Sequence, residues 1–467
     1  MEFRSSSGTE SYYCRLTNCA VIDYNPSNIT TEYKWVSLYG TNNRVDNCYL
    51  KGKNHAGAAL VVWLSAQPNY HLIDSNYFGH RPVLGENGGE TIRVGTSDWS
   101  LYNSRTIVED NYFEKCDGEI EIISSKSCEN IYRHNTFVSC QGTLTLRHGD
   151  RNWVEGNFFF ANKVANSGGV RIIGEDHTVI NNYIADCDGT SLKSALTLMN
   201  GVPNSPLNRY FQVKRALVAF NTLVNNKVNF NIGGGKDSEL TLPPLDCTIA
   251  NNIVKGSVSP LILETDKPIN MIYEGNIFHG ATLGINPVPS GITITDPLLY
   301  RAADTLWRPL SNSPAIGSAA GNYMLITKDI DGHLRGTLKD IGCDQVSTEP
   351  VIYKPLKPGD VGPSWMRTPT IVKEDNIKDI NFRLEQNYPN PFNPRTTIEF
   401  AVKRSGNATL KIFNILGEKV VVLFDGYAEA GKIYRIDFNA ESLTSGVYIA
   451  KLEFDGKYLK QKLTLLK

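Results

Sequence analysis

Two glutamates separated by one residue are the most chemically informative feature of the sequence. Glu119 and Glu121 stand in the β-rich run EIEII. Alternate side chains of a strand point to the same face, so both carboxylates should lie side by side on one surface. Two like charges this close repel each other unless a cation or a cationic group binds them. The pair therefore indicates a site for a metal ion or for a positively charged partner.

Similar β-rich runs before and after this pair carry arginines and threonines. If the runs stack, alternation predicts an outward, charged and hydroxyl-bearing face made of Thr91, Arg93, Glu119, Glu121, Thr143, Thr145, Arg147 and Arg171. The same alternation points Ile120, Ile122, Leu144, Leu146, Val170 and Ile172 inward. A solvated face without a function is the alternative interpretation of these charges.

A short repeat sets the expected fold between about residues 14 and 280. It consists of an apolar residue, two variable residues, Asn, one variable residue and an apolar or aromatic residue, as in VEDNYF and VEGNFF. The repeated asparagines are Asn47, Asn76, Asn111, Asn135, Asn157, Asn182, Asn221, Asn252 and Asn276. Intervals of 22 to 39 residues indicate one structural coil per repeat. We therefore predict an all-β chain whose main part is a right-handed parallel β-helix.

The repeated Asn suits such a coil for two reasons. Asn tolerates the left-handed conformation of a tight corner, and its amide can hydrogen-bond to the equivalent Asn of the next coil. A β-sandwich, the main structural alternative, would show turn signals about every 8 to 12 residues. Three of the nine cysteines, Cys116, Cys140 and Cys187, each follow a repeated Asn by five residues. We expect them to form a column of buried thiols and not disulfides.

Composition excludes some classes of function. The formal net charge is −1, so no global positive field attracts nucleic acid, and an acidic ligand must be held by a local group of Arg and Lys. No apolar run reaches the roughly 18 residues of a membrane-spanning helix. We expect neither a nucleic-acid partner nor a membrane span.

Three motifs in fixed order resemble polysaccharide lyase family 6, which contains chondroitinase B and many alginate lyases. They are NGGETIRVG (87–95), EIEIISSKS (119–127) and TLRHG (145–149), and the resemblance covers roughly residues 14 to 345. It implies that Lys126 abstracts a proton, that Arg147 donates to the leaving oxygen, and that Asn87, Glu119 and Glu121 hold Ca²⁺. It also implies that Arg93, His148 and Arg171 bind the substrate.

The implied reaction is a β-elimination at a uronic acid. Its C5 proton is α to a carboxylate, so the barrier is electrostatic, and a bound cation lowers it. Lys126 can accept the proton only if neighbouring positive charge favours its neutral amine. Arg147 holds its proton too tightly to be a full acid and is expected to act as a hydrogen-bond donor. Strict alternation would turn His148 into the core, and Glu90 is either a further site residue or a structural carboxylate.

The two ends of the chain raise separate expectations. Family members normally begin with additional coils, so we expect the N-terminal coils of the β-helix to be truncated and to leave an exposed sheet edge. MEFRSSSGTES also lacks the features of a signal peptide, which suggests that the natural N-terminus has been removed. Towards the other end, SPAIG (313–317) and DIDGHLR (329–335) resemble the segment that closes many secreted β-helices.

The last part of the chain resembles the type A sorting domain of the type IX secretion system. A proline-containing, exposed linker is expected over 346–381, between a lyase domain (1–345) and this domain (382–467). Residues 382–467 alternate like a small antiparallel β-sandwich, for which a carbohydrate-binding module is the alternative. The resemblance implies that the chain meets the secretion machinery and is secreted or held at the cell surface.

Taken together, the motifs predict an alginate lyase acting on an acidic polysaccharide. A chondroitin or dermatan sulfate lyase would use the same mechanism. A non-catalytic, polysaccharide-binding β-helix and a glycoside hydrolase with paired acids on the same fold are the other candidates. The inserts at 81–106 and 199–216 are the candidates for determining substrate preference.

Overall fold

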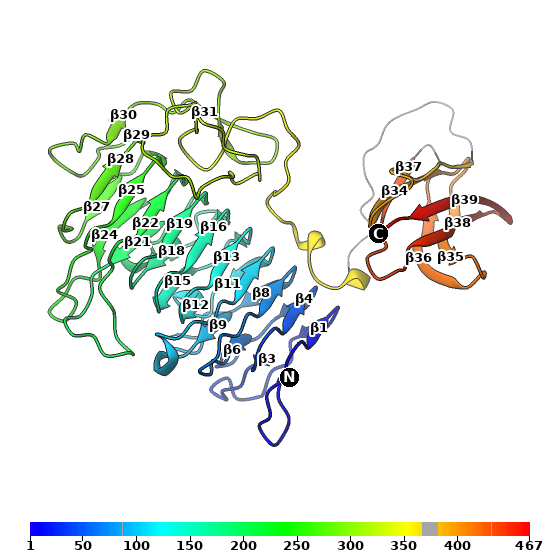
Figure 1. The fold of residues 1–467 in the computed structure, drawn as a ribbon, viewed down its shortest axis with the longest axis horizontal. Helices are drawn as coiled ribbons and strands as arrows, with labels where there is room; N and C mark the ends of the chain where they lie inside the picture. The colour runs from blue at the N-terminus through cyan, green and yellow to red at the C-terminus, as the bar shows by residue number, and fades with distance from the viewer. Residues whose placement is uncertain (86, 367–381, 431) are drawn as a thin grey trace. The chain divides into compact units, whose positions relative to one another are not determined.

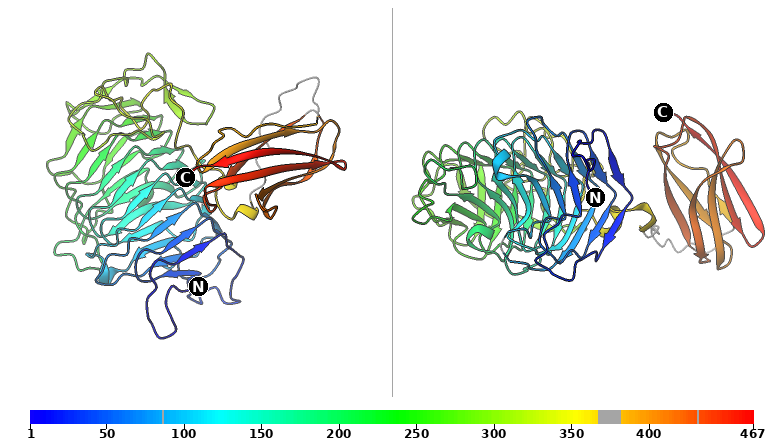
Figure 2. Two further views of the ribbon diagram at one scale, coloured as in Figure 1. Left: turned by 45° about the vertical axis from the view of Figure 1, so that its right-hand side comes forward. Right: turned by 90° about the horizontal axis from the view of Figure 1, so that it is seen from below.

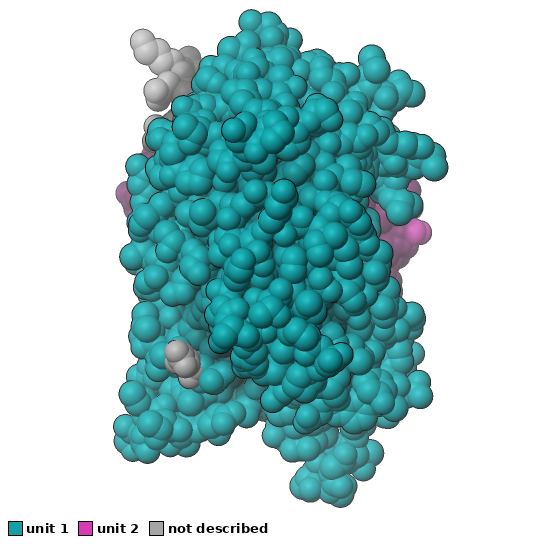
Figure 3. Space-filling view, turned by 90° about the vertical axis from the view of Figure 1, so that its left-hand side faces the viewer, with its two compact units in different colours: residues 1–366 teal, residues 367–467 magenta. Residues whose placement is uncertain are grey.

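The computed structural model describes residues 1–85, 87–366, 382–430 and 432–467. The chain forms two compact units, residues 1–366 and 367–467, which Figure 3 shows in teal and magenta. Among the described residues there is no α-helix, and the only helical turns are four 3-10 segments, at Ser97–Trp99, Ser191–Lys193, Pro358–Asp360 and Ser364–Met366. None of the described segments is a helix long and apolar enough to cross a membrane.

Unit 1 is a parallel β-helix built from three long sheets, whose coils stack along one axis (Figures 1 and 2). The ten-stranded sheet contains β1 (Arg15–Thr17), β4 (Arg44–Asp46), β7 (Leu72–Asp74), β10 (Ile107–Glu109), β13 (Ile131–Arg133), β16 (Trp153–Glu155), β19 (Thr178–Ile180), β22 (Leu217–Ala219), β25 (Thr248–Ala250) and β28 (Ile272–Glu274). The eleven-stranded sheet contains β2 (Ala20–Ile22), β5 (Tyr49–Lys51), β8 (Tyr77–Arg81), β11 (Tyr112–Cys116), β14 (Thr136–Val138), β17 (Phe158–Phe160), β20 (Tyr183–Ala185), β23 (Thr222–Val224), β26 (Ile253–Gly256), β29 (Asn276–Gly280) and β30 (Ile292–Ile294). The nine-stranded sheet contains β3 (Val36–Leu38), β6 (Leu60–Val62), β9 (Ile92–Gly95), β12 (Glu121–Lys126), β15 (Gly142–His148), β18 (Ser167–Ile172), β21 (Leu196–Met199), β24 (Phe230–Gly234) and β27 (Ile262–Glu264). The predicted fold class is confirmed.

A ladder of buried asparagines runs along the β-helix. The side-chain amide of Asn135 donates to Asn157 Oδ1 at 3.0 Å, and Asn157 donates to Asn182 Oδ1 at 2.9 Å. The same bond links the repeated asparagines from Asn76 to Asn276. Each amide also donates to a backbone carbonyl of the preceding coil, so the buried polar groups are paired.

Two details of the predicted ladder were wrong. Asn47 does not belong to it, because the neighbouring Cys48 occupies the ladder position and donates its backbone N–H to Asn76 Oδ1. The left-handed corner also falls one residue earlier than predicted, at residues such as Ser75 (φ 55°) and Asp110 (φ 53°). The Asn itself therefore serves as a hydrogen-bonding group and the residue before it makes the turn.

The nine-stranded sheet alternates as expected on most strands. Ile92, Ile123, Leu144 and Val170 pair in register and belong to the apolar core. The register shifts between Glu121 and Ile123, which indicates a β-bulge. The prediction that Ile120 points inward was wrong, because next to this bulge Ile120 is half-buried and lies outside the core. Ile122 is buried in the core as predicted.

The cysteines are all free thiols, and seven of the nine are buried. The backbone N–H of Cys116 lies 3.4 Å from Cys140 Sγ on the next coil, as the predicted column requires. Cys187 is also buried in the core.

The segment after the last coil covers the outside of the β-helix. Leu283 and Ile292 join the core beside the final coil, whereas the chain beyond, with β31 (Leu299–Arg301) and β32 (Trp307–Pro309), packs against outward side chains of the eleven-stranded sheet. Residues 346–366, expected in an exposed linker, continue along this outside surface. Val361 contacts Tyr77 and Tyr112 there, and Tyr353 stacks on His134. The remainder of the expected linker, 367–381, lies outside the described residues.

Unit 2 contains two antiparallel sheets around a shared apolar core. One contains β33 (Arg383–Leu384), β34 (Arg395–Ala401) and β37 (Ile433–Asn439), and the other contains β35 (Gly406–Asn414), β36 (Lys419–Ala428), β38 (Gly446–Phe454) and β39 (Lys457–Leu465). Phe400 and Phe438 of the first sheet and Leu410 and Leu452 of the second are buried in that core. The predicted small antiparallel sandwich is confirmed.

Candidate active site

A cavity of about 800 Å³ lies over the middle of the nine-stranded sheet. The eight residues that the sequence singles out all line it: Asn87, Arg93, Glu119, Glu121, Lys126, Arg147, His148 and Arg171. The fold therefore brings together residues that are spread along the sequence from position 87 to position 171.

Four adjacent strands position these side chains. Ser124 of β12 pairs with Arg93 of β9 on one side and with Thr145 of β15 on the other, and Thr145 pairs in turn with Arg171 of β18. Lys126 pairs with His148 after a second register shift, at which β15 carries one extra residue, Arg147. The arginines and the lysine therefore project from one face at fixed separations. The two bulges, at Ile122 of β12 and at Arg147 of β15, interrupt the strict alternation of side chains beside Glu121 and His148.

Three carboxylates crowd one side of the cavity. The backbone N–H of Asn87 donates to Glu119 Oε2 at 2.9 Å, and the Glu119 carboxyl group lies close enough to Glu90 for their negative charges to repel each other. Burial, together with repulsion from Glu90 and Glu121, raises the pKa of Glu119 to about 8. Burial opposes ionisation of Glu90 as well, but the charges of Lys126 and Arg93 outweigh it and lower the pKa of Glu90. The cluster thus carries negative charge at a place where water is largely excluded.

Glu121 connects this cluster to two arginines. Arg171 Nη2 donates to Glu121 Oε1, and Arg147 Nε lies 3.6 Å from the same oxygen. Ser124 Oγ donates to the second oxygen, Glu121 Oε2. The side chains of Arg171 and Glu121 are only 2% and 8% exposed, so their charges are scarcely screened by water. These contacts hold the Glu121 carboxylate in one orientation.

Arg147 is held between an aromatic ring and a histidine. Its guanidinium carbon lies 4.1 Å from the ring centroid of Tyr210, and its Nη1 donates to His148 Nδ1 at 3.4 Å. Burial lowers the pKa of Arg147, but a guanidinium starts from so high a value that it stays charged near neutral pH. Its N–H groups are therefore available to a negatively charged oxygen in the cavity.

His148 lies in the cavity wall and not in the apolar core. Its Nδ1 accepts from Arg147, which leaves Nε2 to donate to Ser97 Oγ at 3.3 Å. Burial and the charges of Arg147 and Lys126 lower the pKa of His148 to about 2. The imidazole is thus neutral at any physiological pH and offers no titrating proton.

Sequence reasoning missed part of the cavity wall. Leu192, Lys193, Asn208 and Tyr210 line the cavity but lie outside the three motifs. The long interval between Asn182 and Asn221 marks an insertion here, so the insert at 199–216 was detectable although the role of Tyr210 was not. No repeat phrase specifies the conformation of such a loop.

The acidic side of the cavity fits a hard divalent cation. Asn87, Glu90, Glu119 and Glu121 offer only oxygen atoms from their side chains, the donor set that calcium prefers. Glu90 is 2% exposed, and its Oε2 is buried without a hydrogen-bond partner. A buried carboxylate oxygen without a donor is costly, and a cation would satisfy it. Glu90, whose role the sequence left open, lines the cavity beside Glu119 and Glu121.

Comparisons with known proteins agree with this architecture. Residues 1–294 match the family model described as chondroitinase B, and residues 386–465 match the secretion system C-terminal sorting domain. A sequence search of curated proteins found no match. The sorting domain marks the chain as a secreted or cell-surface protein.

Solved structures give the same result. The alginate lyase AlyGC of family PL6 is 35% identical, with a TM-score of 0.68, over 80% of this chain and 47% of that one. A mannuronic acid-specific family 6 lyase from the human gut microbiota is 33% identical, with a TM-score of 0.55, over 64% of this chain and 71% of that one. A family PL6 polysaccharide lyase from Pseudopedobacter saltans is 29% identical, with a TM-score of 0.51, over 64% of this chain and 75% of that one.

The chain spans about half the length of AlyGC, at 47% and 49% of the two AlyGC chains compared. The family model nevertheless covers the whole β-helix up to β30, including every strand that lines the cavity. The chain therefore belongs to the chondroitinase B family, polysaccharide lyase family 6, and ends in a secretion-sorting domain.

Proposed function

We propose that this protein is a lyase that cleaves alginate by β-elimination, with Lys126 as base and Arg147 as hydrogen-bond donor. The observation that carries the proposal is that the amine of Lys126, the guanidinium of Arg147 and the carboxylates of Glu90, Glu119 and Glu121 all line one cavity. A family of lyases supplies the reaction class, and AlyGC, described as an alginate lyase, supplies the substrate class.

The arrangement supports a division of roles. Lys126 lies on β12 in the cavity wall and takes the C5 proton. Arg147, fixed by Tyr210 and Glu121, keeps its proton and donates hydrogen bonds to the developing charge on the leaving O4. Arg93 and Arg171 supply positive charge along the same column. Arg93 binds substrate carboxylates, whereas Arg171, only 2% exposed, acts by holding Glu121 in place.

Calcium is the proposed cofactor, held by Asn87, Glu90, Glu119 and Glu121. When bound, it would neutralise the uronate carboxylate and stabilise the negative charge that develops as the proton leaves. His148, neutral and hydrogen-bonded to both Arg147 and Ser97, holds the guanidinium in place and can donate to the substrate after a rotation of Ser97.

The test is to incubate the protein with alginate and, separately, with dermatan sulfate and a neutral polysaccharide. A rise in ultraviolet absorbance from an unsaturated product on alginate alone is the expected result. The same signal on dermatan sulfate alone would show that dermatan sulfate, and not alginate, is the substrate, while the reaction class would stay the same. New reducing ends without absorbance would indicate a hydrolase, and no products from any polymer would indicate a binding protein.

A further inference from the structure

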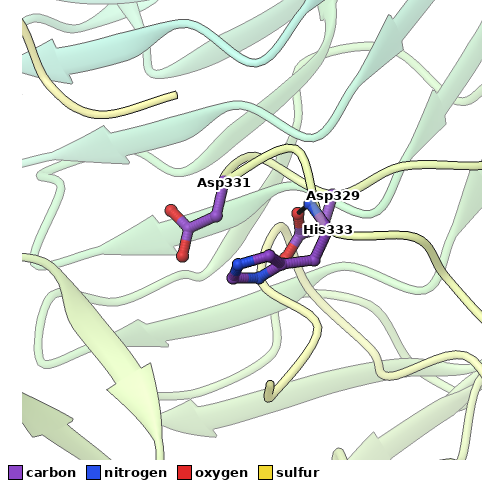
Figure 4. A group of neighbouring side chains, drawn as sticks. All are labelled: Asp329, Asp331 and His333. Carbon is purple, nitrogen blue, oxygen red and sulfur yellow. Dashed lines mark hydrogen bonds and ion pairs between the residues drawn. The ribbon is translucent and has the colours of Figure 1, made fainter. Parts of the chain in front are cut away.

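A second group of metal-ligating side chains lies far along the sequence from the cavity, in the segment that packs outside the β-helix. Asp329, Asp331 and His333 stand on one tight turn, whose ends are joined by a bridge between Lys328 and Leu334. Their ligand atoms lie within 4.8 Å of one another, and the three side chains converge from the same turn (Figure 4). All three residues are buried.

The histidine provides the observation that points to a ligand. His333 Nε2 lies 3.2 Å from the carbonyl oxygen of Pro350, so Nε2 carries the proton and donates it there. Nδ1 is then a lone-pair acceptor, and it is buried without a hydrogen-bond partner, 3.6 Å from Asp329 Oδ2. Two acceptor atoms that face each other inside a protein need a cation between them. His333 is 7% exposed, so bulk water does not supply a donor freely.

The orientation of this histidine is typical of a metal ligand. Ligating imidazoles usually donate their second N–H to a carbonyl or carboxylate, which fixes the tautomer and the ring plane. Here Pro350 takes that role. Asp329 is oriented in a similar way, because its two oxygens accept backbone N–H groups from His333 at 2.7 Å and Gln345 at 2.8 Å. Each oxygen still keeps a further lone pair.

The local charge is unbalanced. Arg308 alone pairs with three carboxylates, at 2.6 Å to Asp304, 2.7 Å to Asp331 and 3.1 Å to Asp344. The other guanidinium, Arg335, donates to backbone carbonyls and to Asn181 Oδ1. With Asp329, four carboxylates face two guanidiniums, which leaves a formal charge of −2. A divalent cation would cancel it.

The ligand chemistry distinguishes this group from the acidic side of the cavity. Calcium prefers oxygen ligands only, whereas two carboxylates with an imidazole suit a zinc-like ion. We propose that Asp329, Asp331 and His333 form a structural site for a divalent first-row transition metal, with zinc as its probe. The site would fasten the turn to the β-helix, where Ile330 packs on Phe158 and Tyr183.

The test measures zinc retained by the full chain after dialysis, in a background with Cys14→Ser and Cys19→Ser, because these two thiols are the accessible ones. We expect one zinc per chain, and His333→Gln to weaken its affinity at least about tenfold. His279→Gln is the matched control, since His279 faces a single carboxylate, Asp296, at 3.7 Å on the surface. Its zinc content should equal that of the parent.

Two results would overturn the proposal. One is an unchanged zinc affinity in a folded His333→Gln protein. The other is the absence of retained zinc in the parent. X-ray absorption of the zinc-loaded parent covers the case in which the variant does not fold. It should report oxygen and imidazole ligands, and sulfur ligands would contradict the assignment.

Discussion

Arg171 and Glu121 form a buried ion pair across an intervening strand: Arg171 lies on β18 and Glu121 on β12, with β15 between them. Arg171→Ala would leave Glu121 buried with only the more distant guanidinium of Arg147, at 3.6 Å. Removal of one partner of a buried pair costs about 3–5 kcal/mol. Urea unfolding of the metal-free protein should show a loss of this size.

The exposed pair Arg209–Glu239 provides the control for that experiment. Its side chains are 39% and 45% exposed, so Arg209→Ala should leave the free energy of unfolding nearly unchanged. Equal losses in the two variants would show that the buried pair has no special role.

We predict that a substitution in the asparagine ladder lowers stability, although none of the ladder asparagines lines the cavity. Asn157 donates to Tyr132 O and to Asn182 Oδ1, and its own Oδ1 accepts from Asn135. Asn157→Ala should cost about 1–3 kcal/mol for each buried partner left unpaired. Thermal unfolding compared with Asn322→Ala, an exposed position, checks this, and a similar Tm in both variants would contradict the ladder's importance.

This ladder also shows how far the sequence could predict the fold. The spacing of the asparagines was sufficient to predict a β-helix because one side chain per coil makes the same bond. It did not locate the left-handed corner, since Ser75 and Asp110 precede the Asn and vary in type. The bulge that moves Ile120 out of the core was not predictable either, because polar and apolar residues alternate in the sequence in the same way with or without a bulge.

The site itself was largely predictable from three motifs, but its wall was not. Tyr210 comes from a loop outside the repeat, and its ring lies 4.1 Å from the guanidinium carbon of Arg147, a contact between residues distant in sequence. The segment 346–366 was expected to be exposed because of its prolines. Val361 nonetheless finds an apolar surface on Tyr77 and Tyr112, a contact between residues distant in sequence.

The raised pKa of Glu119 predicts that the stability of the metal-free protein falls as the pH rises. The pKa of Glu119 rises from 4.5 to about 8 on folding, so its contribution to stability is fully present below pH 4.5 and is lost as the pH rises through about 8. In EGTA, the wild type should therefore lose Tm relative to Glu119→Gln across this range. Parallel Tm curves for the two proteins would contradict the raised pKa.

Calcium binding should also depend on the protonation of Glu119. The metal needs the ionised carboxylate, so binding releases a proton, and calcium affinity should increase with pH up to about 8. Calorimetry in buffers of different ionisation enthalpy measures the proton. Calcium affinity that is independent of pH, or full activity in EGTA, would exclude Glu119 as a ligand of a required ion.

The sorting domain should be dispensable for catalysis. Residues 386–465 match a secretion-sorting family, and none of the described residues that line the cavity lies in unit 2. A chain ending at residue 366 should retain the kcat of the full chain and lose export to the medium or cell surface. A large fall in kcat with an intact fold would give this domain a role in the reaction.

The central claim is that Lys126 removes the C5 proton, and the most direct test is the initial rate of unsaturated product from alginate with Lys126→Met. Loss of a general base lowers kcat by about 10²–10⁴-fold. We expect a loss in this range with little change in KM, while Lys267→Met, at an exposed position, keeps the wild-type rate. A Lys126→Met protein that folds and retains kcat within about tenfold of wild type would contradict the account.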